Sequence, residues 1–119
     1  MSYAIYLYHP QVKATASQGL ELDEFDHPVL SESDVQLFLK ELPRFGYVLE
    51  NQSAVCKEFV KQVGTCPVQV GVFKTEIAFS VPYWSGSADA IFEALQDSAE
   101  LCDTAHLVTF NPQNGEWGP

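Results

Sequence analysis

Hydrophobic and polar residues alternate most clearly in two stretches near the middle of the chain. In residues 68–72 every second residue is valine, and residues 77–81 repeat the alternation with isoleucine, phenylalanine and valine. A period of two is typical of a half-buried strand, because successive side chains of a strand point to opposite faces. The two stretches are predicted to form a hairpin across Lys74-Thr75; a single bent strand is the alternative.

Further strands are predicted toward the two ends of the chain. Residues 3–8 (YAIYLY) are aromatic and β-branched, and Pro10 ends this strand because proline cannot donate a backbone hydrogen bond. A short strand is expected at 47–49 and a final strand at 107–110. Asn114-Gly115 is a strong signal for a tight turn, after which Trp117 can fold back beside the last strand.

Three helices are predicted from apolar residues at helical spacing. Ser31 begins a helix of about ten residues that ends before Pro43. Ser53 is expected to cap a second helix that ends at Gly64, and Val55, Cys56, Phe59, Val60 and Val63 lie on one of its sides. A third helix follows the turn Ser85-Gly86-Ser87. Residues 11–30 show no sustained period and are predicted to form a long loop.

The third helix separates charge from apolar surface. At roughly 100° per residue its acids fall on one stripe: Asp89, Glu93, Asp97, Glu100 and Asp103. The opposite arc holds Ala88, Ile91, Phe92, Leu95, Ala99 and Cys102. Like charges at this spacing cost about 0.2 to 0.5 kcal/mol per pair, and acids near the carboxyl end of a helix oppose its dipole. We therefore expect the stripe to face outward and to meet a cationic partner.

The order of these elements is strand, helix, strand, helix, hairpin, helix, strand, within a single domain over residues 1–119. This order predicts an α+β fold, with a mainly antiparallel sheet and the helices packed on one face. A ferredoxin-like variant with an inserted helix is one form of this fold.

The charge of the chain restricts its partners. Six basic and sixteen acidic residues give a formal net charge of −10, which repels nucleic acid and anionic membranes. A basic protein, or no partner, fits this charge. No apolar run approaches the eighteen or so residues that span a bilayer, and the first residues lack the basic region of a secretory signal. We therefore expect a cytoplasmic protein without membrane association.

No constellation of residues specifies a reaction, a metal site or a cofactor. The acidic segment 21–27 combines carboxylates with His27, but its spacing matches neither calcium nor zinc sites, and a solvated loop is favoured. His9 and His106 have no nucleophile near them in the sequence and are expected to form structural hydrogen bonds. The three cysteines show no metal or redox spacing and are expected to be reduced and structural.

Tyr83 and Trp84 follow the predicted hairpin and precede the third helix. Binding residues are often displayed on such connections, and both residue types are enriched at interface hot spots. The two rings could anchor a partner; the alternative is that they close the end of the core.

Several stretches resemble a family of small bacterial proteins: SYAIYLYHP, GLELDEFDHP, Phe45-Gly46-Tyr47, FKTEIAFSVPYW and FNPQNGEW. In size, acidity and the motif Asn111-Pro112-Gln113, the chain is also similar to compact immunity proteins of toxin systems. Asn111 stands where the resemblance would place an aspartate. The resemblance implies no catalytic residue and no cofactor.

The sequence therefore favours a non-enzymatic binding protein, of the kind that immunity-type inhibitors of basic toxins are. The predicted partner-binding residues are Asp89, Glu93, Asp97, Glu100, Tyr83 and Trp84. One alternative is a small enzyme or ligand-binding domain with a cleft between helices and sheet. Another is self-association to a homodimer through an exposed edge strand.

Overall fold

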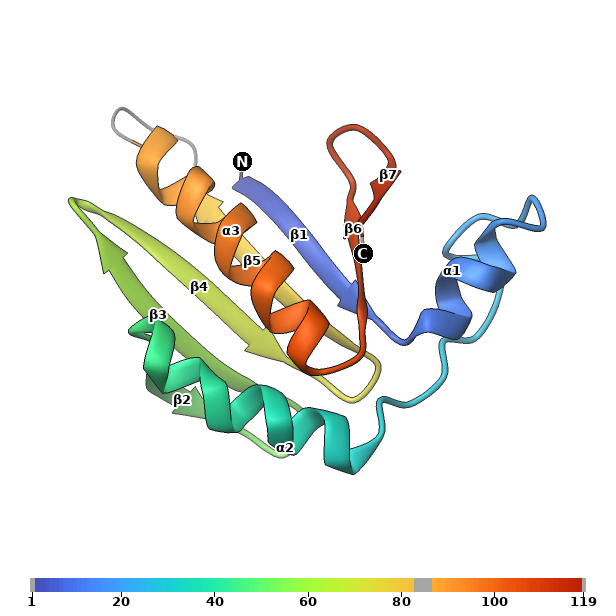
Figure 1. Ribbon diagram of the computed structural model, residues 1–119, viewed down its shortest axis with the longest axis horizontal. Helices are drawn as coiled ribbons and strands as arrows, with labels where there is room; N and C mark the ends of the chain where they lie inside the picture. The colour runs from blue at the N-terminus through green and yellow to red at the C-terminus, as the bar shows by residue number, and fades with distance from the viewer. Residues whose placement is uncertain (1, 83–86, 119) are drawn as a thin grey trace.

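A computed structural model describes residues 2–82 and 87–118, and in these residues seven strands form one antiparallel sheet. The strand order is β2-β3-β4-β5-β1-β6-β7 (Figure 1). The strands are β1 (Ser2–Tyr8), β2 (Val48–Gln52), β3 (Lys57–Val63), β4 (Cys66–Val72), β5 (Glu76–Pro82), β6 (Val108–Asn111) and β7 (Glu116–Trp117). The helices are α1 (Pro10–Ala16), α2 (Glu32–Glu41), the short 3₁₀ helix η1 (Leu42–Phe45) and α3 (Ala88–Thr104).

The predicted α+β fold is confirmed. α2 and α3 lie on the same face of the sheet, whereas α1 lies beyond the end of β1 (Figure 1). Strands β4, β5, β1 and β6 are neighbours, and with α2 and α3 as crossovers they have a ferredoxin-like arrangement. Among the described helices, none combines the length and the apolar character that crossing a membrane requires.

The element inserted in this arrangement is a strand hairpin, and the helix predicted from Ser53 to Gly64 is wrong. The Ser53 side chain accepts hydrogen bonds from the backbone of Val55 and Cys56, so a residue type that caps helices here stabilises a turn instead. The chain then continues as β3, which pairs with β4 along its whole length. This pairing, together with the β-branched and aromatic residues of the segment, outweighs its helical spacing.

The loop predicted for residues 11–30 begins later than expected, because α1 occupies its first part. Pro10 stands at the start of α1, where the missing N–H of proline is tolerated. The His9 side chain caps the helix by accepting a hydrogen bond from the Gln11 backbone at 3.0 Å. The same two residues that end β1 therefore begin α1.

The other predicted elements within the described residues are confirmed; the turn predicted at Ser85-Gly86 lies outside them. Ser31 caps α2 by accepting from the Asp34 backbone at 3.1 Å. The alternating stretches form the hairpin β4–β5, in which Val72 lies opposite Ile77, so the single bent strand is excluded. Trp117 folds back opposite Phe110 in the last hairpin.

The core lies between the sheet and the two helices. Leu7, Ile77 and Phe79 are fully buried on the covered face of the sheet, and Phe38 of α2 meets the Phe79 ring edge-on, with 6.2 Å between ring centroids. Burial of such a side chain contributes about 1.5 to 3 kcal/mol. This packing fixes the positions of α2 and α3 on the sheet.

The motif Asn111-Pro112-Gln113 has a structural role. The Gln113 side chain accepts from the Ala4 backbone N–H at 3.0 Å and donates to the Ala4 carbonyl at 2.7 Å. Gln113 therefore satisfies the hydrogen-bonding groups of the Ala4 backbone. Ala4 lies just before residues 6–8, the part of β1 that pairs with β6. Asn111 donates to the Tyr3 hydroxyl at 2.9 Å, so both polar side chains of the motif tie the last hairpin to β1.

Candidate functional site

α3 is rotated about its axis relative to the predicted orientation. Its buried residues are Ala90, Ala94, Asp97, Ser98, Leu101 and Cys102. Phe92 is 66% exposed and Leu95 39% exposed, so the centre of the buried arc differs from the predicted one by roughly a third of a turn. The predictions that Phe92 and Leu95 pack inward and that Asp97 faces outward are wrong. Small residues dominate the buried side, which lets α3 lie close to the sheet.

A network of polar side chains explains why an aspartate can be buried. Lys61 of β3 donates to Asp97 at 3.0 Å and to Glu93 at 2.8 Å, and the Tyr47 hydroxyl donates to Asp97 at 2.8 Å. The Lys61 ammonium also lies 5.3 Å from the centroid of the Tyr47 ring, within the range of a cation–π interaction. Asp97 therefore offers almost no surface to a partner, and Glu93 shares its charge with Lys61.

The electrostatics of this network are those of a structural ion pair. Burial alone would lower the pKa of Lys61, but the hydrogen bonds to Glu93 and Asp97 outweigh it and the pKa is raised. Burial, and then the hydrogen bond to Asp97, raise the pKa of Tyr47 well above its ordinary value. Lys61 is therefore a cation and Tyr47 a neutral hydroxyl near neutral pH, and neither is activated as a nucleophile.

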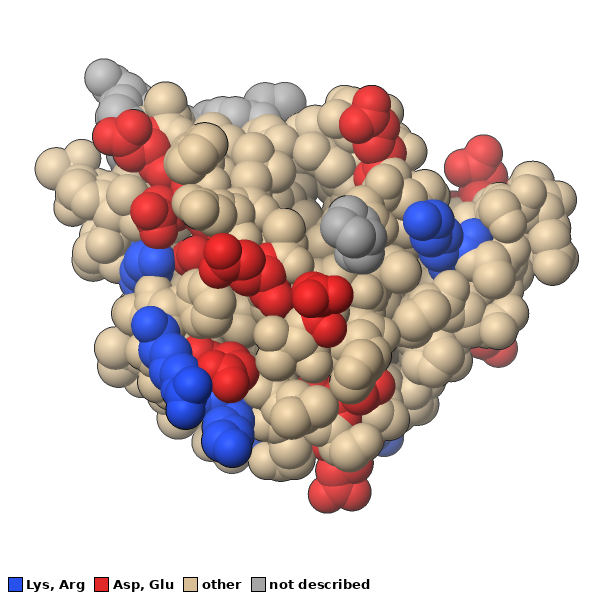
Figure 2. Space-filling model, viewed as in Figure 1, with Lys and Arg blue, Asp and Glu red and all other residues tan. Residues whose placement is uncertain are grey.

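The outward side of α3 combines exposed apolar side chains with acids. Phe92 and Leu95 lie on the same side as the exposed Asp89, Glu100 and Asp103. Figure 2 shows acidic side chains in a row along α3, while a group of lysine and arginine side chains lies over the region of β2 and the end of α2. Of the other predicted partner-binding residues, Tyr83 and Trp84 lie outside the described residues.

The three histidines form separate local contacts. The His27 ring donates to the Leu22 carbonyl at 2.8 Å and meets the Tyr8 ring edge-on. His106 lies 3.3 Å from an Asp34 carboxylate oxygen across the surface, and His9 caps α1. Within residues 2–82 and 87–118, no group of three or more histidine, cysteine or acidic side chains is placed to hold a metal ion.

The three cysteines lie in different surroundings. Cys66 and Cys102 are buried and Cys56 is half-buried. Burial, with a smaller effect of Asp103, raises the pKa of Cys102 to about 12. Burial and then Glu58 raise the pKa of Cys56. A raised pKa lowers the thiolate fraction at neutral pH, so neither thiol has the character of an activated nucleophile.

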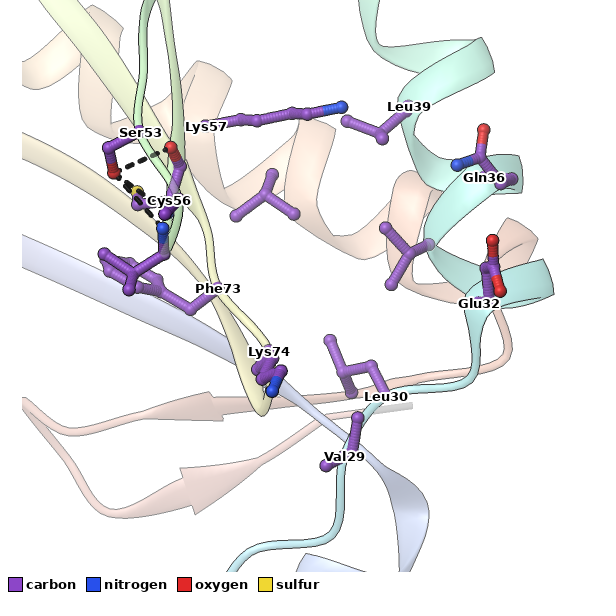
Figure 3. Close-up of a pocket in the computed structure, with 14 residues that line it drawn as sticks. Val29, Leu30, Glu32, Gln36, Leu39, Ser53, Cys56, Lys57, Phe73 and Lys74 are labelled. Atoms are coloured by element: carbon purple, nitrogen blue, oxygen red, sulfur yellow. Dashed lines mark hydrogen bonds between the residues drawn. The ribbon is translucent and has the colours of Figure 1, made fainter.

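A groove opens between α2 and the turns that join β2 to β3 and β4 to β5 (Figure 3). It has a volume of about 390 Å³. Its apolar lining includes Val29, Leu30, Val35, Leu39, Val55, Val72 and Phe73. The sequence offered a cleft between helices and sheet only as an alternative and identified none of this lining, because the lining comes from segments far apart in the chain and follows no single spacing.

Comparison of the chain with protein-family models, curated proteins and solved structures finds no match. The candidate sites are therefore the outward side of α3 and the groove beside α2, each defined by its own geometry.

Proposed function

We propose that this domain is a non-enzymatic protein that binds a basic protein partner, in the way that an immunity-type inhibitor binds a basic toxin. The observation that carries the proposal is the outward side of α3, where the exposed Phe92 and Leu95 share one side of the helix with three exposed acids. We call Phe92, Leu95, Asp89, Glu100 and Asp103 the α3 patch.

The charge of the surface supports a basic partner. Eleven of the sixteen acids are exposed: Glu21, Asp23, Glu24, Asp26, Glu32, Glu50, Glu58, Asp89, Glu100, Asp103 and Glu116. Lys61 is occupied by the internal network, and no lysine or arginine follows Lys74 in the sequence. Long-range attraction then speeds association with a basic protein, and salt screens this effect.

The α3 patch has the composition of an interface with an apolar centre and a charged rim. Exposed aromatic side chains are frequent anchors at interfaces, because each buries a wide apolar face when bound. Phe92 would act as such an anchor, the role that the sequence also suggested for Tyr83 and Trp84, which lie outside the described residues. Asp89 and Glu100 would meet lysine or arginine at the rim, where charge steers binding more than it strengthens it.

Capture from cells that make the protein tests this proposal. The immobilised wild-type domain is expected to retain a basic protein at low salt, and Phe92→Ala is expected to weaken that binding by at least about tenfold. Asp89→Lys together with Glu100→Lys should slow association at low salt, with a smaller difference at high salt.

Val48→Ala is the matched control, because Val48 is 65% exposed on β2, away from the α3 patch. It should bind like the wild type. Equal binding by Phe92→Ala and Val48→Ala, or a captured partner without an excess of lysine and arginine, would contradict the proposal.

A further inference from the structure

The groove beside α2 has the features of a ligand site and lies outside the α3 patch. Pockets of roughly 300 to 1,000 Å³ with a mainly apolar lining and a few polar groups are typical of small-molecule sites, and this groove has a volume of about 390 Å³. One wall is α2, and the other is the end of the sheet. The Leu30 backbone donates to the Lys74 carbonyl at 2.9 Å, which joins the segment before α2 to the β4–β5 turn.

The groove gathers apolar side chains that face water. Val55 is 75% exposed, Val29 60% and Phe73 39%, and all three line the groove together with the partly buried Val35 and Leu39. Single exposed apolar residues are ordinary on protein surfaces, but their convergence on one concavity marks a binding surface. The occupant should therefore present hydrocarbon to this lining.

The charged side chains around the groove indicate the chemistry of the ligand's polar end. Lys57 and Lys74, two of only six basic residues in the chain, line the sheet wall. Figure 3 shows the Lys57 side chain running from β3 toward α2, with its nitrogen on the side of Leu39. No ion pair found among the described side chains uses either lysine. The one carboxylate of the lining, Glu32, lies on the opposite wall in α2.

We propose that this groove binds a fatty acid, with its carboxylate at Lys57 or Lys74 and its chain against the apolar lining. A cationic amphiphile would be repelled by the two lysines, and a neutral one would leave them without a partner. The site is separate from the α3 patch and does not depend on the proposed function.

Titration with dodecanoate below its micelle concentration tests the proposal by calorimetry. Dodecanoate should bind, and dodecylamine of equal chain length should bind at least about tenfold more weakly. From octanoate to dodecanoate, affinity should rise about fourfold for each methylene that the groove covers. The variant Lys57→Gln with Lys74→Gln should lose about tenfold in affinity. Lys13→Gln, on α1, is the matched control and should bind like the wild type.

Alkylation of Cys56 locates the ligand. Cys56 lines the groove and is half-buried, whereas Cys66 and Cys102 are buried, so bound dodecanoate should slow its reaction with iodoacetamide. The proposal is overturned by absent binding, by equal binding of dodecanoate and dodecylamine, or by binding that leaves Cys56 unprotected. Cys56 could also become protected without ligand, to a degree that grows with protein concentration. That result would identify the groove as an interface between copies of the chain and would also overturn the fatty-acid proposal.

Discussion

Replacing Asp97 with alanine is expected to lower the free energy of unfolding by about 3 kcal/mol. The Asp97 carboxylate accepts from both Lys61 and Tyr47, and its side chain is only 8% exposed. Its removal leaves the buried Tyr47 hydroxyl without this acceptor and Lys61 with Glu93 alone. Losing one member of a buried charged pair costs more than the pair itself contributes, because the remaining partner stays desolvated. Urea denaturation followed by circular dichroism measures the change.

Asp103→Ala is the matched control for this prediction. Asp103 is an exposed acid in the last turn of the same helix, where it opposes the helix dipole. Its replacement should change the free energy of unfolding by less than about 0.5 kcal/mol, in the stabilising direction. In a Lys61→Met background, Asp97→Ala should cost less than in the wild type, because the two residues interact directly. Equal effects of the Asp97 and Asp103 replacements would contradict the network.

Phe79→Ala is expected to lower the free energy of unfolding by about 4 kcal/mol. The ring is fully buried, and it meets Phe38 of α2 and Tyr47 edge-on, with 6.2 Å and 6.0 Å between ring centroids. Its loss would leave a cavity where α2, the sheet and the Tyr47 segment meet, and such cavities are only partly closed by relaxation. The same denaturation experiment measures this effect.

Phe92→Ala provides the comparison for Phe79→Ala with the same change of side chain. Phe92 is 66% exposed, so its replacement should cost less than about 1 kcal/mol. The same variant is expected to lose partner binding, which separates a role in recognition from a role in folding. A large loss of stability in Phe92→Ala would show that α3 packs through this ring and would contradict the observed orientation.

Local patterns in the sequence correctly predicted the elements that have either a strongly periodic sequence or a local stabilising contact. The β4–β5 hairpin followed from strict alternation, and α2 followed from its Ser31 cap. The segment that became β3 had its apolar residues at helical spacing, and pairing with β4 made it a strand instead. Ser53 gave the same local signal for a helix cap and for a turn.

The orientation of α3 could not be predicted from its own residues. A helical wheel places every carboxylate outward, because an unpaired buried charge is costly. Asp97 can be buried because its carboxylate accepts hydrogen bonds from the Lys61 ammonium and the Tyr47 hydroxyl. Lys61 lies on β3 and Tyr47 directly precedes β2, so neither partner is visible in the sequence of α3. The lining of the groove beside α2 could not be identified for a similar reason, since several distant segments form it.

The orientation of α3 underlies both the internal network and the α3 patch, and carboxyl footprinting tests it directly. The native protein is treated with a carbodiimide and glycine ethyl ester, and mass spectrometry measures the labelling rate at each acid. Asp97 should react far more slowly than the exposed Asp89 and Glu100 of the same helix. Labelling of Asp97 as fast as that of Asp89 would show that the acidic stripe faces solvent, and it would contradict the network and the orientation of Phe92 together.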